Sequence, residues 1–162
     1  MAVKFLTTIY GEGRPAEYLA NYAGFPLKEE LPLGTLVAMD DDNVSLVQAD
    51  EDKVPVGIVN KLDVIGMHDS LYLSGERDEM KAPIGTHIEL HKHFLVSGLK
   101  VEGTLKIGAP VYLTGKKGNA KLTVTKPETG FCVGVVERVT DSLVRFDLTF
   151  AGILKLTTSK ID

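Results

Sequence analysis

The chain has 162 residues, 44% of them hydrophobic, a size and composition that suit one folded domain with extensions. Its net charge of -4, from 18 basic and 22 acidic residues, argues against a surface that neutralises nucleic-acid phosphates. The sequence offers no apolar run of about 20 residues for a membrane helix. Its first residues lack the apolar core of a signal peptide, and its single cysteine, Cys132, excludes an intramolecular disulfide. We therefore expect no direct contact with nucleic acid or membrane, synthesis in the cytoplasm, and a buried, inert thiol.

Residues 1–30 differ from the rest of the chain because aromatic residues are interspersed with glycine and proline. Residues 16–23 are compatible with a short helix, with Pro15 at its first turn and Gly24 beyond its end. A helix of this length is not stable alone, so we expect an extended arm that lies on its own domain or on a partner. The arm residues of the types enriched at protein interfaces are Tyr10, Arg14, Tyr18, Tyr22 and Phe25.

Two stretches, residues 31–60 and 105–137, share one pattern. Each opens with Gly-x-x-Val and closes with Val-Gly-(Val/Ile)-Val, and a polar, turn-forming insert separates the two ends. Because the inserts differ in length, we expect two related β units of one domain and not a stacked array of repeats. The matching ends are residues 34–37 and 56–59 in the first stretch and residues 108–111 and 133–136 in the second.

Apolar runs between turn residues predict strands at residues 33–39, 44–49 and 54–59. Three aspartates occupy the first intervening turn, residues 40–43. The spacing of an EF-hand calcium loop is missing there, so we interpret these aspartates as a solvated turn.

A strand over residues 85–94 would carry a row of four polar side chains on one face. They are His87, Glu89, His91 and His93. The outward face of an amphipathic strand is the favoured interpretation. A metal site remains an alternative because imidazole and carboxylate bind zinc and similar ions, as does a pH-sensitive patch between subunits.

The second half of the chain contains the clearest hairpins. Residues 115–119 form a strong turn signal inside the second unit. Residues 131–138 and 143–150 predict two antiparallel strands joined by a turn, and the second of them alternates regularly between apolar and polar residues. The tail, residues 151–162, is apolar enough to add a strand to a sheet edge or to a neighbouring subunit.

These elements predict a mainly β fold, a small antiparallel β-barrel or sandwich built from the two related units. We expect the domain to span residues 31–150, preceded by the arm, residues 1–30, and followed by the tail, residues 151–162. No phosphate-binding glycine loop, dinucleotide fingerprint, nucleophile elbow or Cys-x-x-Cys pair is present in the sequence. We therefore expect neither enzymatic activity nor a cofactor.

The second unit and the hairpin after it resemble the head decoration proteins of tailed double-stranded DNA bacteriophages, also called cement or capsid-stabilising proteins. The first unit resembles the earlier half of the same pattern. The matching residues are Gly108-x-x-Val111-Tyr112-Leu113, the turn glycine Gly118, Gly130-x-x-Val133-Gly134-Val135-Val136-Glu137, and a closing strand over residues 144–148.

This resemblance implies a non-enzymatic protein, without cofactor, on the outer surface of a phage head. Such a protein binds the major capsid protein and clamps neighbouring subunits against the pressure of the packaged DNA. The resemblance also implies a small homo-oligomer, a trimer more than a dimer, that becomes part of the virion after synthesis in the host cytoplasm. The alternatives are another virion module, such as a tail or fibre component, and a small metal-binding β-barrel.

Overall fold

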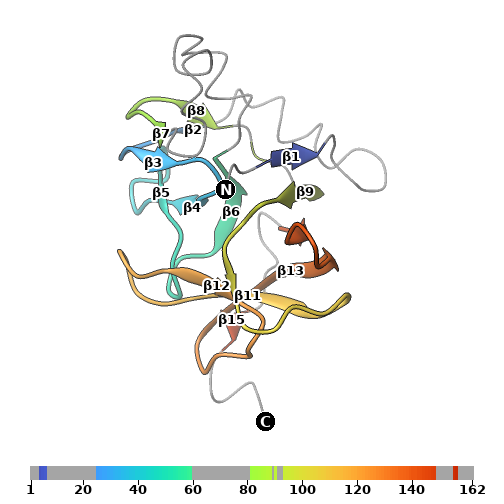
Figure 1. Cartoon of the computed structure of the whole chain (residues 1–162). Helices are drawn as coiled ribbons and strands as arrows, with labels where there is room; N and C mark the ends of the chain where they lie inside the picture. The colour runs from blue at the N-terminus through green and yellow to red at the C-terminus, as the bar shows by residue number, and fades with distance from the viewer. Residues whose placement is uncertain are drawn as a thin grey trace.

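Figure 1 shows the computed structural model of the chain, in which every regular element of the described part is a β-strand. The described residues are 4–6, 25–59, 81–88, 90, 93–148 and 155–156. The prediction of a mainly β fold is therefore confirmed. The helix expected at residues 16–23 lies outside the described residues.

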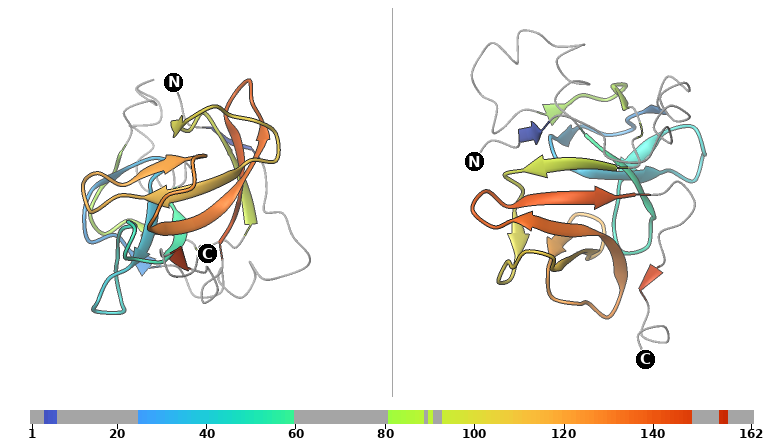
Figure 2. Two further views of the ribbon diagram at one scale, coloured as in Figure 1. Left: turned by 90° about the horizontal axis from the view of Figure 1, so that it is seen from below. Right: turned by 90° about the vertical axis from the view of Figure 1, so that its right-hand side faces the viewer.

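The largest sheet curls into a half-barrel, as both views in Figure 2 show. Seven of its strands follow one another in space as β1 (Lys4–Leu6), β9 (His93–Ser97), β14 (Leu143–Asp147), β13 (Gly130–Arg138), β11 (Pro110–Thr114), β12 (Lys121–Thr123) and β10 (Val101–Glu102). The pairing of β10 with β12 is parallel, and the other pairs are antiparallel. The eighth strand, β15 (Lys155–Leu156), pairs with β13, so part of the tail adds a strand to this sheet.

Three small sheets lie beside the half-barrel. One has the order β5 (Leu46–Gln48), β4 (Leu36–Met39) and β6 (Pro55–Ile58). The other two are pairs, β2 (Phe25–Pro26) with β8 (His87–Ile88) and β3 (Leu31–Pro32) with β7 (Lys81–Ala82). In Figure 1 these short strands gather at one end of the molecule, above β12 and β11.

The two related stretches of sequence fold in the same way. We call residues 31–59 unit one and residues 105–136 unit two. In each unit the first long strand lies in the middle and pairs with both of the others: β4 with β5 and β6, and β11 with β12 and β13. Val37 faces Gly57 in unit one, and Val111 faces Gly134 in unit two.

A β-bulge follows these pairs at the same position in both units. The residue before each glycine, Val56 or Val133, has no partner across the ladder, so the register shifts by one residue. An extra residue of this kind changes which side chains point to each face beyond it. The bulge therefore sets which residues of each closing segment enter a core.

The turn that opens each unit is also repeated. The main-chain N–H of Gly34 donates to the carbonyl of Val59 at 2.9 Å, and that of Gly108 donates to the carbonyl of Val136 at 2.7 Å. Both glycines have positive φ, 83° and 82°, a conformation that other residues adopt only with strain. The shared glycines of the sequence pattern are thus explained by one backbone geometry used twice.

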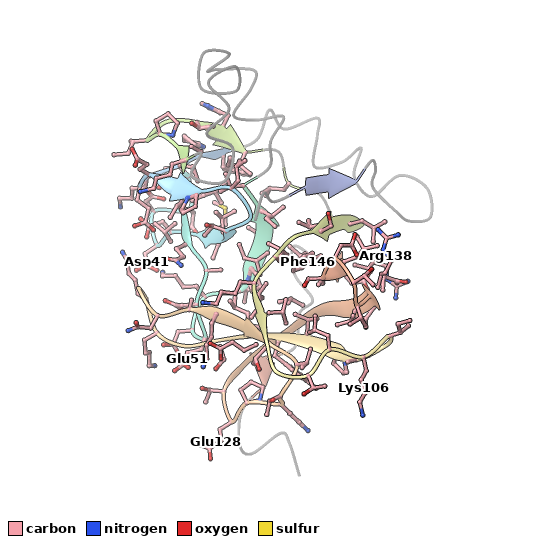
Figure 3. The ribbon with its side chains drawn as sticks, in the orientation of Figure 1. Asp41, Glu51, Lys106, Glu128, Arg138 and Phe146 are labelled. Atoms are coloured by element: carbon pink, nitrogen blue, oxygen red, sulfur yellow. The ribbon has the colours of Figure 1, made fainter. Side chains whose placement is uncertain are left out.

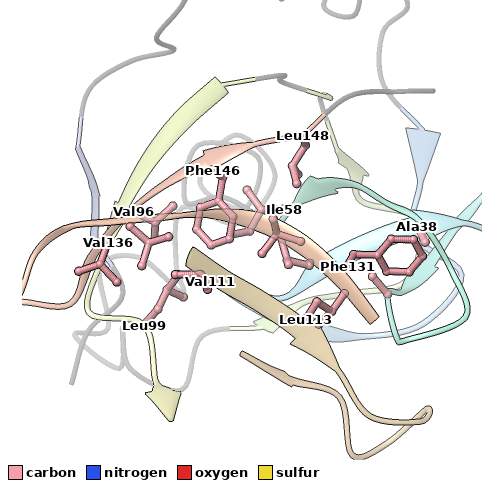
Figure 4. Packing of buried hydrophobic residues seen from close by; sticks show 14 residues of the cluster. Ala38, Ile58, Val96, Leu99, Val111, Leu113, Phe131, Val136, Phe146 and Leu148 are labelled. Carbon is pink, nitrogen blue, oxygen red and sulfur yellow. The ribbon is translucent and has the colours of Figure 1, made fainter. Parts of the chain in front are cut away.

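Two clusters of buried apolar side chains form the interior. Core one, shown in Figure 4, lies inside the half-barrel and contains Leu36, Ala38, Ala49, Ile58, Val96, Leu99, Val111, Leu113, Phe131, Val133, Val136, Val144, Phe146 and Leu148. Core two lies among the small sheets and contains Leu27, Leu31, Leu33, Val37, Leu46, Val56, Val59, Ala82, Ile88 and Leu90. The sheet β5-β4-β6 separates the two cores, because alternate residues along β4 point to opposite sides.

Cys132 is exposed, and the expectation of a buried thiol is wrong. Its neighbours Phe131 and Val133 both point into core one, so the alternation along β13 directs Cys132 to the outer face. The residues around the thiol still shield it in part and raise its pKa, and the nearby carboxylate of Asp147 raises it further. The thiol is accessible but carries little thiolate at neutral pH.

Candidate interaction surface

Four of the five predicted contact residues in the arm, Tyr10, Arg14, Tyr18 and Tyr22, lie outside the described residues. The fifth, Phe25, belongs to β2 and pairs with Ile88 of β8. Phe25 is half-buried and packs against core two. It therefore fixes the end of the arm to the domain, and a second part of the arm, the strand β1, pairs with β9 and forms one edge of the large sheet.

The structure does not form the histidine row that the metal-site alternative requires. His87 lies in β8, which pairs with β2, whereas His93 lies in β9, which pairs with β14 in a different sheet. The prediction of one continuous strand over residues 85–94 is therefore wrong for these two histidines. Glu89 and His91 lie outside the described residues.

The reason is that the chain passes from one core to the other at this point. Ile88 and Leu90 are buried in core two, and Val96 is buried in core one. A strand with a single apolar face cannot serve both cores. Among the described residues, no three His, Cys, Asp or Glu side chains lie close enough together to hold a metal ion.

The aspartate turn is stabilised by hydrogen bonds within the turn and by an ion pair with Lys28. Asp42 Oδ1 accepts the main-chain N–H of Val44 at 2.9 Å and of Ser45 at 3.0 Å, the hydrogen bonding typical of an aspartate-led turn. Lys28 Nζ lies 2.6 Å from Asp40 Oδ2, and this contact, with a main-chain hydrogen bond, lowers the pKa of Asp40. These aspartates hold the turn together in the way that the solvated-turn interpretation implies.

A polar junction joins the two units, and Glu51, labelled in Figure 3, lies at its centre. Its carboxylate accepts hydrogen bonds from Gly115 N–H at 3.1 Å and from Thr129 Oγ1 at 3.0 Å. Lys116 Nζ lies 2.9 Å from Glu51 and 2.7 Å from Asp52. The hydrogen bond from Lys116 is the largest of several contacts that lower the pKa of Glu51. This role of Glu51 has no signature in the sequence, because an acidic residue in a turn does not indicate a partner 64 positions away.

A groove of about 460 Å³ lies between the two units, beside β10 and β12. Lys121 Nζ lies 2.7 Å from Glu102 Oε2 at its border, so an ion pair occupies part of the rim. The apolar residues lining the groove include Leu33, Leu36, Ala49, Leu99, Leu113 and Leu122, and the polar ones include Gln48, Lys100, Glu102 and Lys121.

One apolar side chain stands out at the surface of unit two. Ile107 is 74% exposed, whereas Leu33, at the equivalent position of unit one, is 9% exposed. The turn that carries Ile107 also carries Lys106, which is labelled in Figure 3. No sequence signal separates these two positions, since both residues precede the glycine of the same turn.

Comparisons of the chain with protein-family models, with curated proteins and with solved structures found no match. Within the part of the chain that the structure describes, no helix has the length and apolar character needed to cross a membrane.

Proposed function

We propose that this protein decorates the head of a tailed bacteriophage, where it binds the outer surface of the capsid and stabilises contacts between major capsid protein subunits. The proposal rests on the resemblance of the two units to head decoration proteins. One observation carries it: apart from the closing strand, the residues of that resemblance form a bulged, three-stranded motif that occurs twice in the chain. Gly108, Gly130 and Gly134 each occupy a position in this motif that other residues do not readily fill.

The architecture suits a clamp. Decoration requires a body that does not deform when capsid subunits are pushed apart, and buried cores on both sides of β4 and β6 provide such a body. The junction at Glu51 ties the two units together through main-chain and side-chain contacts. The arm offers tyrosine and arginine, which often dominate the energy of protein contacts.

The test is cosedimentation of the purified full chain with expanded, undecorated heads of the matching phage. We expect saturable binding at a fixed ratio of copies to capsid subunits. Binding to tails with none to heads would replace the proposal by the tail-component alternative. Absence of binding to either particle would reject a virion role.

The contribution of the arm is tested by replacing Tyr10, Tyr18 and Tyr22 with serine while Phe25 is kept, because Phe25 packs against core two. We expect the affinity for heads to fall by about tenfold or more, the effect of losing aromatic anchors. Ile84→Ser is a matched control, since Ile84 is an exposed aliphatic residue of the domain. Unchanged affinity of the triple variant would assign capsid binding to another surface.

A further inference from the structure

The turn that opens each unit is closed by the same main-chain hydrogen bonds. In unit one the N–H of Thr35 donates to the carbonyl of Pro32 at 3.3 Å, and in unit two the N–H of Ala109 donates to the carbonyl of Lys106 at 3.0 Å. The three residues before the turn glycine of unit two are therefore held as their counterparts in unit one are, and the two sets can be compared position by position. We call these three residues of unit two, 105–107, the open segment.

In unit one the equivalent residues are covered by a second extended segment. β3 pairs with β7 in the antiparallel direction, with Leu31 opposite Ala82 and Pro32 opposite Lys81. The side chains of Leu31, Leu33 and Ala82 are all buried in core two. The second segment thus supplies both a main-chain neighbour and an apolar cover.

The open segment has no such cover among the described residues. No described strand includes any of residues 103–109, so this stretch has no partner in a β-ladder of the described part. Leu105 is half-buried against core one, and Lys106 and Ile107 are exposed. A stretch of extended main chain without a ladder partner is a template for the addition of a strand. The position that is covered in unit one is therefore open in unit two.

The exposed lysine of the open segment indicates the charge of a fitting partner. In Figure 3 the side chain of Lys106 points away from the body of the molecule. Within the described residues Lys106 makes no ion pair, whereas Lys116 of the same unit is paired with two carboxylates. Opposite charges across a ladder stabilise the pairing, so an acidic residue suits the position opposite Lys106. A small apolar residue suits the position opposite Leu105, as Ala82 does opposite Leu31.

We propose that the open segment receives an extended segment of the major capsid protein, which adds a strand antiparallel to it as β7 does to β3. The capsid segment carries an acidic residue opposite Lys106, a small apolar residue opposite Leu105, and an apolar side chain that covers Ile107. Main-chain hydrogen bonds supply affinity in a contact of this kind, and the alternating side chains supply specificity. The assignment to the capsid rests on the proposed function, and it adds a contact of the domain to those of the arm.

Cosedimentation of full-length variants with expanded, undecorated heads tests this contact. Ile107→Asp should lower the affinity by about a hundredfold, because the new carboxylate would be buried without a partner. Lys106→Glu should lower it by about tenfold, because like charges would then lie opposite each other. The matched controls are Ile84→Asp, at an aliphatic residue that is 69% exposed in a turn outside both units, and Lys126→Glu, at another exposed lysine of unit two. Both controls should bind as the wild-type chain does, and circular dichroism establishes that all four variants are folded.

Hydrogen exchange supplies a second readout. The amide protons of the open segment should exchange more slowly in the chain bound to heads than in the free chain. Binding of the wild-type chain with unchanged affinity of both Ile107→Asp and Lys106→Glu would overturn the proposed contact and leave the proposed function standing. Absence of wild-type binding would overturn both. Protection of the open segment in the free chain that rises with protein concentration would overturn the contact in favour of one between copies of this chain.

Discussion

Units one and two pair their strands alike but lie in different surroundings. In unit one both faces of the β4-β6 pair are covered, one by core one and the other by core two. In unit two the inner face of β11 and β13 belongs to core one, and the outer face remains partly exposed. The difference comes from residues 25–32, 81–88 and 90, which supply part of core two, whereas no described segment covers the outer face of unit two in the same way. The repeated sequence thus specifies how the strands of each unit pair. The segments outside the repeat decide which unit is buried on both faces.

The largest expected difference between the units is the loss in free energy of unfolding when the glycine of each closing segment is replaced. Gly134→Ala should lower the free energy of unfolding by about 4 kcal/mol or more, because the new β-carbon would overlap the main-chain oxygen of Arg145. Gly57→Ala should cost about 1–3 kcal/mol, because the new carbon meets the end of the Leu90 side chain at 2.7 Å, and that side chain can move. Urea denaturation of both variants measures the difference, and equal losses would show that the two closing segments are packed alike.

The residues before the turn glycines give the next contrast. Leu33→Ala should cost about 2–5 kcal/mol, because it empties space in core two. Ile107→Ala should change stability by no more than about 0.5 kcal/mol, because Ile107 is exposed. Thermal unfolding of the two variants beside the wild-type chain checks this pair. A large loss at Ile107 would mean that this side chain is covered in solution.

The junction between the units should make a smaller contribution to the free energy of unfolding, and this contribution should depend on pH. Glu51→Ala should cost about 1–3 kcal/mol, because Gly115 N–H and the Thr129 hydroxyl lose their acceptor. The contacts with Lys116, Thr129 and Gly115 lower the pKa of Glu51 below its ordinary value of 4.5. The stabilisation is therefore present above the pKa of the unfolded chain and is lost as the pH falls through the lower pKa of the folded chain.

Denaturation midpoints between neutral and acidic pH measure this dependence. The stability of Glu51→Gln should fall less steeply below about pH 4.5 than that of the wild-type chain. Glu128→Gln serves as the control, because Glu128 is an exposed glutamate in unit two. If the midpoints of Glu51→Gln and of the wild-type chain change in parallel with pH, the Glu51 carboxylate does not stabilise the junction.

The smallest effect concerns reactivity and leaves stability unchanged. At low protein concentration Cys132 should react with a maleimide in the folded state, because its side chain is exposed. The reaction should be slower than in urea at the same neutral pH, because shielding raises the pKa of the thiol in the folded chain. Stopped reactions followed by mass spectrometry give both rates. If the thiol of the folded chain does not react, the Cys132 side chain is buried.

Sequence patterns predict the strands and turns correctly where these depend on neighbouring residues. Strands predicted at residues 33–39, 44–49 and 54–59 contain β4, β5 and β6. The alternation predicted for the closing hairpin is confirmed by the burial of Val144, Phe146 and Leu148. The relation between the two units was also visible, because the turn glycines and the closing Val-Gly pairs each serve one backbone geometry.

What the sequence did not disclose depends on contacts between distant segments. An apolar run such as residues 131–136 does not reveal which residues face outward. The prediction of a buried thiol at Cys132 is wrong for that reason. The break between β8 and β9 follows from the presence of two cores, which local periodicity cannot distinguish from one. The junction at Glu51 depends on a partner far along the chain.

The measurement that most directly tests the proposed clamp is the release of DNA from filled, undecorated heads on heating, followed with a dye that fluoresces on binding DNA. We expect the release temperature to rise as the full chain is added and to level off at the ratio at which binding saturates. A release temperature that stays the same in the presence of excess protein would contradict a stabilising role on the capsid.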